Sequence, residues 1–127
     1  MTAAYLDTHV VVYLHAGLTE SLSVKAKRQI ESSDLLISPI VNLELDYLRR
    51  RNRIAASPRT ILQDLGKSIG LAVCRLPFAT VCEEATNIEW TTDPFDKLIV
   101  AQAAANRQAP LISADRVIRA NYANCVW

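Results

Sequence analysis

Residues 93–103 have the sequence DPFDKLIVAQA, and this stretch is the clearest guide to the fold. Aspartate followed by proline is typical of a helix start, because Asp93 can cap the first turn and Pro94 already has a helical φ angle. The alanine-rich continuation predicts a helix to about Arg107. A short apolar segment at 110–113 follows and predicts a strand. This part of the chain therefore alternates helix with strand.

The same alternation extends through the rest of the sequence. Apolar segments predict strands at 3–6, 35–37, 71–74, 110–113 and 125–127. Helical patterns fall at 9–15, 23–32, from 39, 57–70, from 77 to about 90, and in a short segment after 115. Strands separated by helices need crossover connections, so we predict an α/β fold with a mostly parallel sheet and helices on both faces. A length of 127 residues predicts a single domain, 1–127.

Composition narrows the class of protein without naming an activity. The net charge of +1 does not indicate a strong field towards nucleic acid. Cys74, Cys82 and Cys125 are widely spaced, so neither a disulfide framework nor a zinc site is predicted. No apolar run approaches the roughly 20 residues of a membrane span, and no signal core is evident. We therefore expect a cytoplasmic protein that does not insert into a membrane.

Acidic residues fall where a parallel sheet binds its ligands. Asp7 and Asp115 directly follow predicted strands, Asp96 lies in the first turn of a helix, and Glu44 lies in the helix after the second strand. Such positions converge beyond the carboxyl ends of the strands. Carboxylates about 5 Å apart repel by roughly 3 kcal/mol per pair, so gathering them favours a hard divalent cation bound through oxygen. Such a site suits hydrolysis of phosphodiesters.

Each acid also has a purely structural interpretation. Asp7 and Asp115 can cap the helices that follow them, and Asp96 can belong to a capping box begun by Asp93. Glu44 is harder to explain in this way, although Asp46 is an alternative functional acid on the same helix. The four acids together, in their strand-end context, carry more weight than any one of them.

The sequence resembles the PIN domains and, among them, the VapC-type toxins of VapBC toxin–antitoxin pairs. The similarity covers nearly the whole chain and is carried by residues 5–10 (YLDTHV), 38–45, 93–103, 111–115 and 126–127, in the order typical of the family. The Asp-Pro-Phe-Asp run with its helix is the most specific of these segments.

The resemblance implies a three-layer α/β/α sandwich that binds Mg²⁺ or Mn²⁺ and cleaves single-stranded RNA. The catalytic residues would be Asp7, Glu44, Asp96 and Asp115, with Asp7, Asp96 and Asp115 as metal ligands. Substrate contacts would come from Thr8, Ser113, Lys97, Arg50 and Arg51. Lys97 stands where relatives commonly have arginine, which keeps the charge but loses a bidentate phosphate donor. Thr91-Thr92 replaces a histidine and a basic residue common in close relatives.

The basic run from Arg49 to Arg53 has three interpretations: a solvated helix end, a strip for RNA phosphates, or contact with an acidic partner segment. The resemblance implies a homodimer and a cognate antitoxin, for which Lys97 or the arginines would be anchors. Two other functions remain open, an RNA-processing PIN nuclease outside a toxin–antitoxin system and a non-catalytic PIN domain that binds RNA or protein.

Overall fold

The computed structural model describes all residues from Met1 to Trp127. The strands are β1 (Ala3–Leu6), β2 (Asp34–Ile37), β3 (Ala72–Val73), β4 (Leu111–Ile112) and β5 (Cys125–Val126). The helices are α1 (Thr8–Ala16), the short 3-10 helix η1 (Thr19–Ser21), α2 (Val24–Glu31), α3 (Pro39–Arg50), α4 (Pro58–Ile69), α5 (Phe78–Ala85), α6 (Pro94–Ala105) and α7 (Arg116–Asn121). The predicted alternation is confirmed. None of these helices has the length and apolar character that crossing a membrane requires.

The strands form one sheet in the order β3-β2-β1-β4-β5, and every neighbouring pair is parallel. The chain moves outward from β1 through β2 to β3 and then returns to place β4 on the other side of β1. The strand order therefore reverses between β1 and β4. In open α/β sheets, ligands bind beyond the carboxyl ends of the strands at such a switch point.

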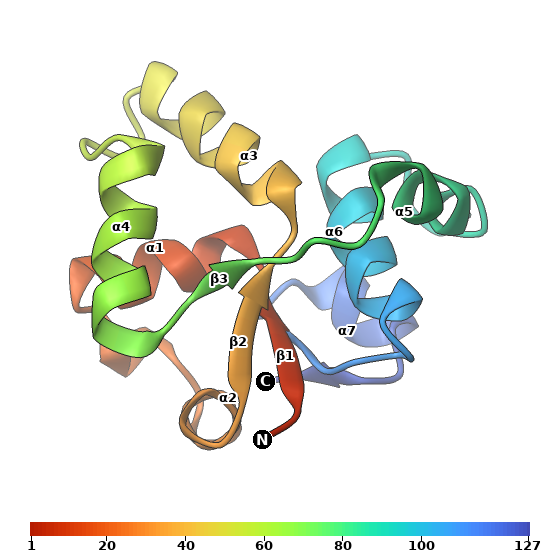
Figure 1. The fold of residues 1–127 in the computed structure, drawn as a ribbon, viewed down its shortest axis with the longest axis horizontal. Helices are drawn as coiled ribbons and strands as arrows, with labels where there is room; N and C mark the ends of the chain where they lie inside the picture. The colour runs from red at the N-terminus through yellow and green to blue at the C-terminus, as the bar shows by residue number, and fades with distance from the viewer.

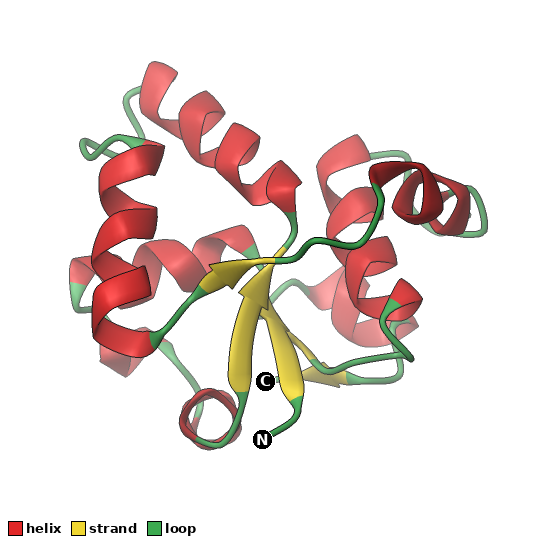
Figure 2. Cartoon of the chain, viewed as in Figure 1, coloured by secondary structure: helices red, strands yellow, loops and turns green.

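Helices cover both faces of this sheet. Figures 1 and 2 show α1 and α4 on one side and α5, α6 and α7 on the other, with the strands between them. The predicted three-layer α/β/α arrangement with a parallel sheet is thus confirmed. Helices α3 and α6 come from opposite sides of the switch point and contact each other at the carboxyl edge of the sheet.

Asp93 caps α6 as predicted, and Ser57 followed by Pro58 begins the predicted helix α4 in the same way. Ser57 Oγ accepts a hydrogen bond from Thr60 N at 3.1 Å, and Asp93 Oδ1 accepts one from Phe95 N at 2.8 Å. These bonds satisfy backbone N–H groups that the first helical turn leaves without partners. Helix α4 ends at Gly70, whose φ of 70° is left-handed and costs glycine little.

Helix α5 is shorter than predicted, because it ends at Ala85 and not near Trp90. The hydroxyl of Thr86 donates to the carbonyl of Glu83 at 2.6 Å. Threonine and asparagine bond local backbone groups in non-helical conformations and so compete with helix propagation. Strands β3, β4 and β5 are also short, with two residues each.

The centre of the core is the pair β1–β4. Leu6 and Ile112 are neighbours in this pair and are fully buried. Tyr5 is 1% exposed, and its hydroxyl accepts a hydrogen bond from Asn106 Nδ2 at 2.9 Å and lies 3.1 Å from Cys74 Sγ. The hydroxyl of a buried tyrosine needs such partners. Strand β1 is therefore held to two segments, around Cys74 and Asn106, that lie far from it in sequence.

We expect Ile112→Ala to lower the free energy of unfolding by about 3 kcal/mol, because it opens a cavity beside the strand that carries the carboxyl edge. Urea denaturation measures the change. Val117→Ala is the matched control, since this side chain is 49% exposed and its loss should cost less than about 0.5 kcal/mol. Similar costs for the two variants would contradict this description of the core.

Candidate active site

A cleft of about 400 Å³ opens at the carboxyl edge of the sheet, at the switch point between β1 and β4. Its walls come from α1, α3, α6 and the two loops that follow β1 and β4. The lining residues are Asp7, Thr8, His9, Val12, Tyr13, Glu44, Leu48, Arg53, Ile54, Asp96 and Asp115. The structure therefore brings together all four acids that the sequence singled out.

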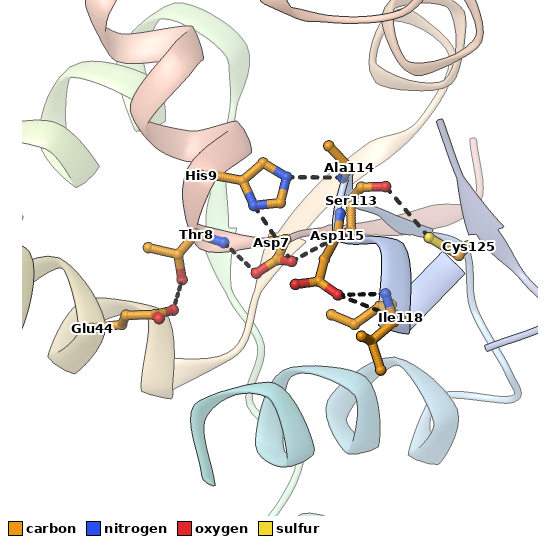
Figure 3. Close-up of polar contacts among 10 residues, drawn as sticks. Asp7, Thr8, His9, Glu44, Ser113, Ala114, Asp115, Ile118 and Cys125 are labelled. Carbon is orange, nitrogen blue, oxygen red and sulfur yellow. Dashed lines mark hydrogen bonds and ion pairs between the residues drawn. The ribbon is translucent and has the colours of Figure 1, made fainter. Parts of the chain in front are cut away.

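Asp7 lies deepest and is 5% exposed. Its Oδ1 accepts a hydrogen bond from Thr8 N at 2.8 Å, and its Oδ2 accepts one from Ser113 Oγ at 2.6 Å. The carboxylate thus caps α1 and ties the end of β1 to the end of β4 (Figure 3). Ser113 was predicted to contact substrate, but it is fully buried and instead orients Asp7.

Asp115 is fixed by the helix that it begins. Its Oδ1 accepts hydrogen bonds from Val117 N at 2.9 Å and Ile118 N at 3.0 Å. The other carboxylate oxygen has no protein donor and is turned towards Asp7 in Figure 3. One oxygen of Asp115 therefore stabilises α7, while the second is free for a ligand.

Glu44 reaches the cleft from α3 and accepts a hydrogen bond from the hydroxyl of Thr8 (Figure 3). Burial raises the pKa of the Glu44 carboxyl, the bond from Thr8 opposes this rise, and the negative charges of Asp7 and Asp93 add to it. Asp46, the alternative acid, does not line the cleft and pairs with Arg50 at 3.0 Å. The structure therefore favours Glu44 over Asp46.

Asp96 is the acid whose charge is least compensated. Burial, and after it the negative charges of Asp93, Asp7, Asp115 and Glu44, together raise the pKa of Asp96 to about 7. No protein group donates a hydrogen bond to its carboxylate, whereas Asp7, Glu44 and Asp115 each accept at least one. A cation in the cleft would relieve this crowding of negative charge.

His9 is a site residue that the sequence analysis did not single out. Its Nε2 accepts a hydrogen bond from Ala114 N at 2.9 Å, and its Nδ1 lies 3.6 Å from Asp7 Oδ2. Because Nε2 is an acceptor, the proton of the neutral ring resides on Nδ1, facing the carboxylate. The ring also packs edge-on against Tyr13 and Trp127. Its position two residues after Asp7 was the only sequence signal.

The basic residues lie differently from the prediction. Arg53 lines the cleft, although Arg50 and Arg51 were the predicted substrate contacts. The side chain of Arg50 is 78% exposed and paired with Asp46, and the guanidinium of Arg51 lies 5.5 Å from the centre of the Tyr47 ring. Lys97 does not line the cleft. Arg53 is thus the one lysine or arginine among the residues that line the cleft.

The donor set can be tested against a divalent metal ion. No three His, Cys, Asp or Glu side chains are grouped closely enough to enclose an ion. Mg²⁺ does not require this, since it keeps several waters and binds through one or two carboxylates. Asp96 and Asp115 both have a carboxylate oxygen without a protein donor, and all the acids offer oxygen ligands. The residues therefore fit a hydrated Mg²⁺ or Mn²⁺ ion.

Comparisons with known proteins show the family and the fold of the chain. The family model for the PIN domain matches residues 4–124. No curated protein matches the chain. Among solved structures, the chain is similar to one in "VapBC2 from Rickettsia felis bound to a DNA fragment from their promoter", with a TM-score of 0.62 and 20% identity. The match covers 98% of this chain and 96% of that one. At this identity the likeness concerns the fold.

In protein freed of divalent ions, we expect Asp96→Asn to raise the free energy of unfolding by about 1–2 kcal/mol near pH 8, after allowance for screening by solvent. The folded pKa of about 7 lies above the ordinary value of 3.8, so wild-type stability falls as pH rises from about 4 to about 7. The gain in the variant should therefore shrink towards pH 4.

Urea denaturation across this pH range, with EDTA present, measures the effect. Asp34→Asn is the control, since this aspartate is exposed and lies outside the cleft. A gain that does not depend on pH would contradict the assigned crowding of charge.

Proposed function

The chain belongs to the PIN-domain family, and from its acidic cleft we propose that it is a divalent-metal-dependent endoribonuclease that cleaves single-stranded RNA. The observation that carries the proposal is the meeting of Asp7, Glu44, Asp96 and Asp115 in one cleft, with the pKa of Asp96 raised to about 7. PIN domains are generally nucleases. Crowded carboxylates repel one another, and a bound divalent cation would neutralise them without protonation.

We assign the four acids two different roles, metal binding and proton acceptance. Asp7, Asp96 and Asp115 would hold Mg²⁺ or Mn²⁺ directly or through water. When bound, such an ion polarises a phosphoryl oxygen and lowers the pKa of a water molecule. Glu44 is suited to accept a proton, because burial raises the pKa of its carboxyl above the usual range. Arg53, at the wall of the cleft, would offset the negative charge of the phosphate.

The fold also bears on the biological role of the chain and on its protein partner. We propose that the chain is the toxin of a VapBC-type pair, held inactive by a cognate antitoxin and acting in the cytoplasm as a homodimer. Its likeness to a chain of a VapBC2 complex supports an antitoxin partner. An RNA-processing nuclease outside such a pair is the alternative. A binding-only PIN domain is disfavoured because each acid faces the cleft.

We expect Asp115→Asn to lower RNA cleavage at least 100-fold while the fold is retained, since asparagine caps a helix as well as aspartate does. Purified protein, freed of any antitoxin, is incubated with single-stranded RNA and Mg²⁺, Mn²⁺ or EDTA. Asp7→Asn should have the same effect, although its loss of charge also alters the bond to Ser113. Asp46→Asn is the control and should cleave normally, because Asp46 lies outside the cleft. Activity that persists in EDTA or in Asp115→Asn would contradict the proposal.

We expect Mn²⁺ to raise the unfolding midpoint of the wild type, because a ligand that binds only the folded state stabilises it by about 2.7 kcal/mol at a hundred times its Kd. Asp96→Asn should respond much less, since it lacks the charge that the ion relieves. Differential scanning fluorimetry over a Mn²⁺ titration measures both proteins. Equal shifts would place the ion elsewhere.

A further inference from the structure

An aromatic pair formed by the exposed Tyr47 and the half-buried Phe95 lies where α3 contacts α6, and neither ring belongs to the hydrophobic core or lines the acidic cleft. Tyr47 on α3 and Phe95 on α6 have ring centres 5.9 Å apart and planes inclined by 44°. Tyr47 is 48% exposed, which is unusual for a large ring that has a neighbour to pack against. The guanidinium of Arg51 lies 5.5 Å from the centre of the Tyr47 ring. We call Tyr47, Phe95 and Arg51 the aromatic platform.

The platform is adjacent to the acids on both helices. Tyr47 follows Glu44 by three residues on α3, so the two side chains share one face of that helix. Phe95 immediately precedes Asp96 in the first turn of α6. Both Glu44 and Asp96 line the cleft, and the two helices contact each other. The platform residues do not line the cleft themselves, but they neighbour its acids on both helices, so we place the platform at the rim of the cleft where α3 meets α6.

The positive charges near the aromatic platform indicate whether a nucleic acid or an apolar protein segment binds there. An exposed aromatic ring alone would suit an apolar protein segment as well as a nucleotide base. Here the guanidinium of Arg51 lies over the Tyr47 ring. Arg53, two residues further along the chain, lines the cleft. Stacking surfaces interleaved with arginines are the means by which single strands are held, because every base has a π-face and every nucleotide a phosphate.

We propose that Tyr47 and Phe95 stack one unpaired base of the RNA next to the bond that is cut, while Arg51 and Arg53 contact its phosphates. This inference rests on the proposed nuclease function and specifies how that site selects its substrate. The platform admits a base only when it is unpaired, so a duplex is not held there. Stacking depends little on base identity, so the platform selects single strands and not a sequence.

Binding by a cleavage-defective protein tests the platform directly. Fluorescence anisotropy with Asp115→Asn and a labelled single-stranded RNA of about 12 nucleotides gives the Kd in Mg²⁺. Adding Tyr47→Ala should weaken binding roughly 10- to 100-fold. Tyr47→Phe and Tyr47→Trp should preserve binding, whereas Tyr47→Leu should lose as much as alanine does. Phe78→Ala is the matched control and should bind normally, since Phe78 is 61% exposed on α5 and outside the cleft.

Abasic RNAs locate the base that stacks. An RNA that lacks the stacked base should bind the platform-intact protein more weakly, and Tyr47→Ala should then cost nothing further. Additive losses at every abasic position would overturn the proposal. Full binding by Tyr47→Leu would also overturn it and would instead mark the rim as an apolar docking surface for a protein partner.

The outcomes separate this inference from the nuclease proposal. RNA binding that needs Tyr47, in a wild-type protein that does not cleave, would support the platform and contradict the nuclease. Cleavage of single strands that is unaffected by Tyr47→Ala would support the nuclease and contradict the platform. Circular dichroism of each variant confirms that the fold is intact, as expected for a half-exposed side chain.

Discussion

The carboxylate of Asp7 is the group on which the rest of the site depends. It accepts hydrogen bonds from Thr8 N and Ser113 Oγ, and so it joins the two central strands at the point where strand order reverses. His9 reinforces the same junction by accepting a bond from Ala114 N, beside Asp115. Two loops more than one hundred residues apart in sequence are thereby held in one geometry. The positions of the other acids follow from this junction and from the helices that leave it.

The cleft compensates part of its own negative charge. Helices α1, α6 and α7 all begin there, and Asp7, Asp93 and Asp115 cap them. The N–H groups and positive ends of helix dipoles favour carboxylates at these positions. Asp96 lies in the first turn of α6 yet keeps a raised pKa, so the helix ends do not cancel the crowding completely. Under the proposed function, this residual charge would favour binding of a divalent cation in the cleft.

The parts of the structure that local chemistry governs were predictable from sequence. The alternation of strands and helices and the caps at Ser57 and Asp93 depend on neighbouring residues, and they were confirmed. The choice between Glu44 and Asp46 depended on which face of α3 meets α1 and α6, which sequence did not show. The bond from Ser113 to Asp7 and the part of His9 were not predicted, because their partners lie about a hundred residues away. The early end of α5 reflects competition between Thr86 and the helix backbone.

The residues in and around the cleft are of two kinds, which differ in how much the stability of the fold depends on them. Asp7 and Asp115 stabilise the fold, since both cap helices and Asp7 also accepts a hydrogen bond from the buried Ser113. Tyr47 and Arg51 are exposed at the end of α3, and neither belongs to the hydrophobic core. Over evolutionary time the exposed set can change without loss of stability, whereas a change in the acids disturbs the framework. Under the proposed function, proteins built on this plan can therefore diverge in the RNAs they bind while the acids of the cleft stay the same.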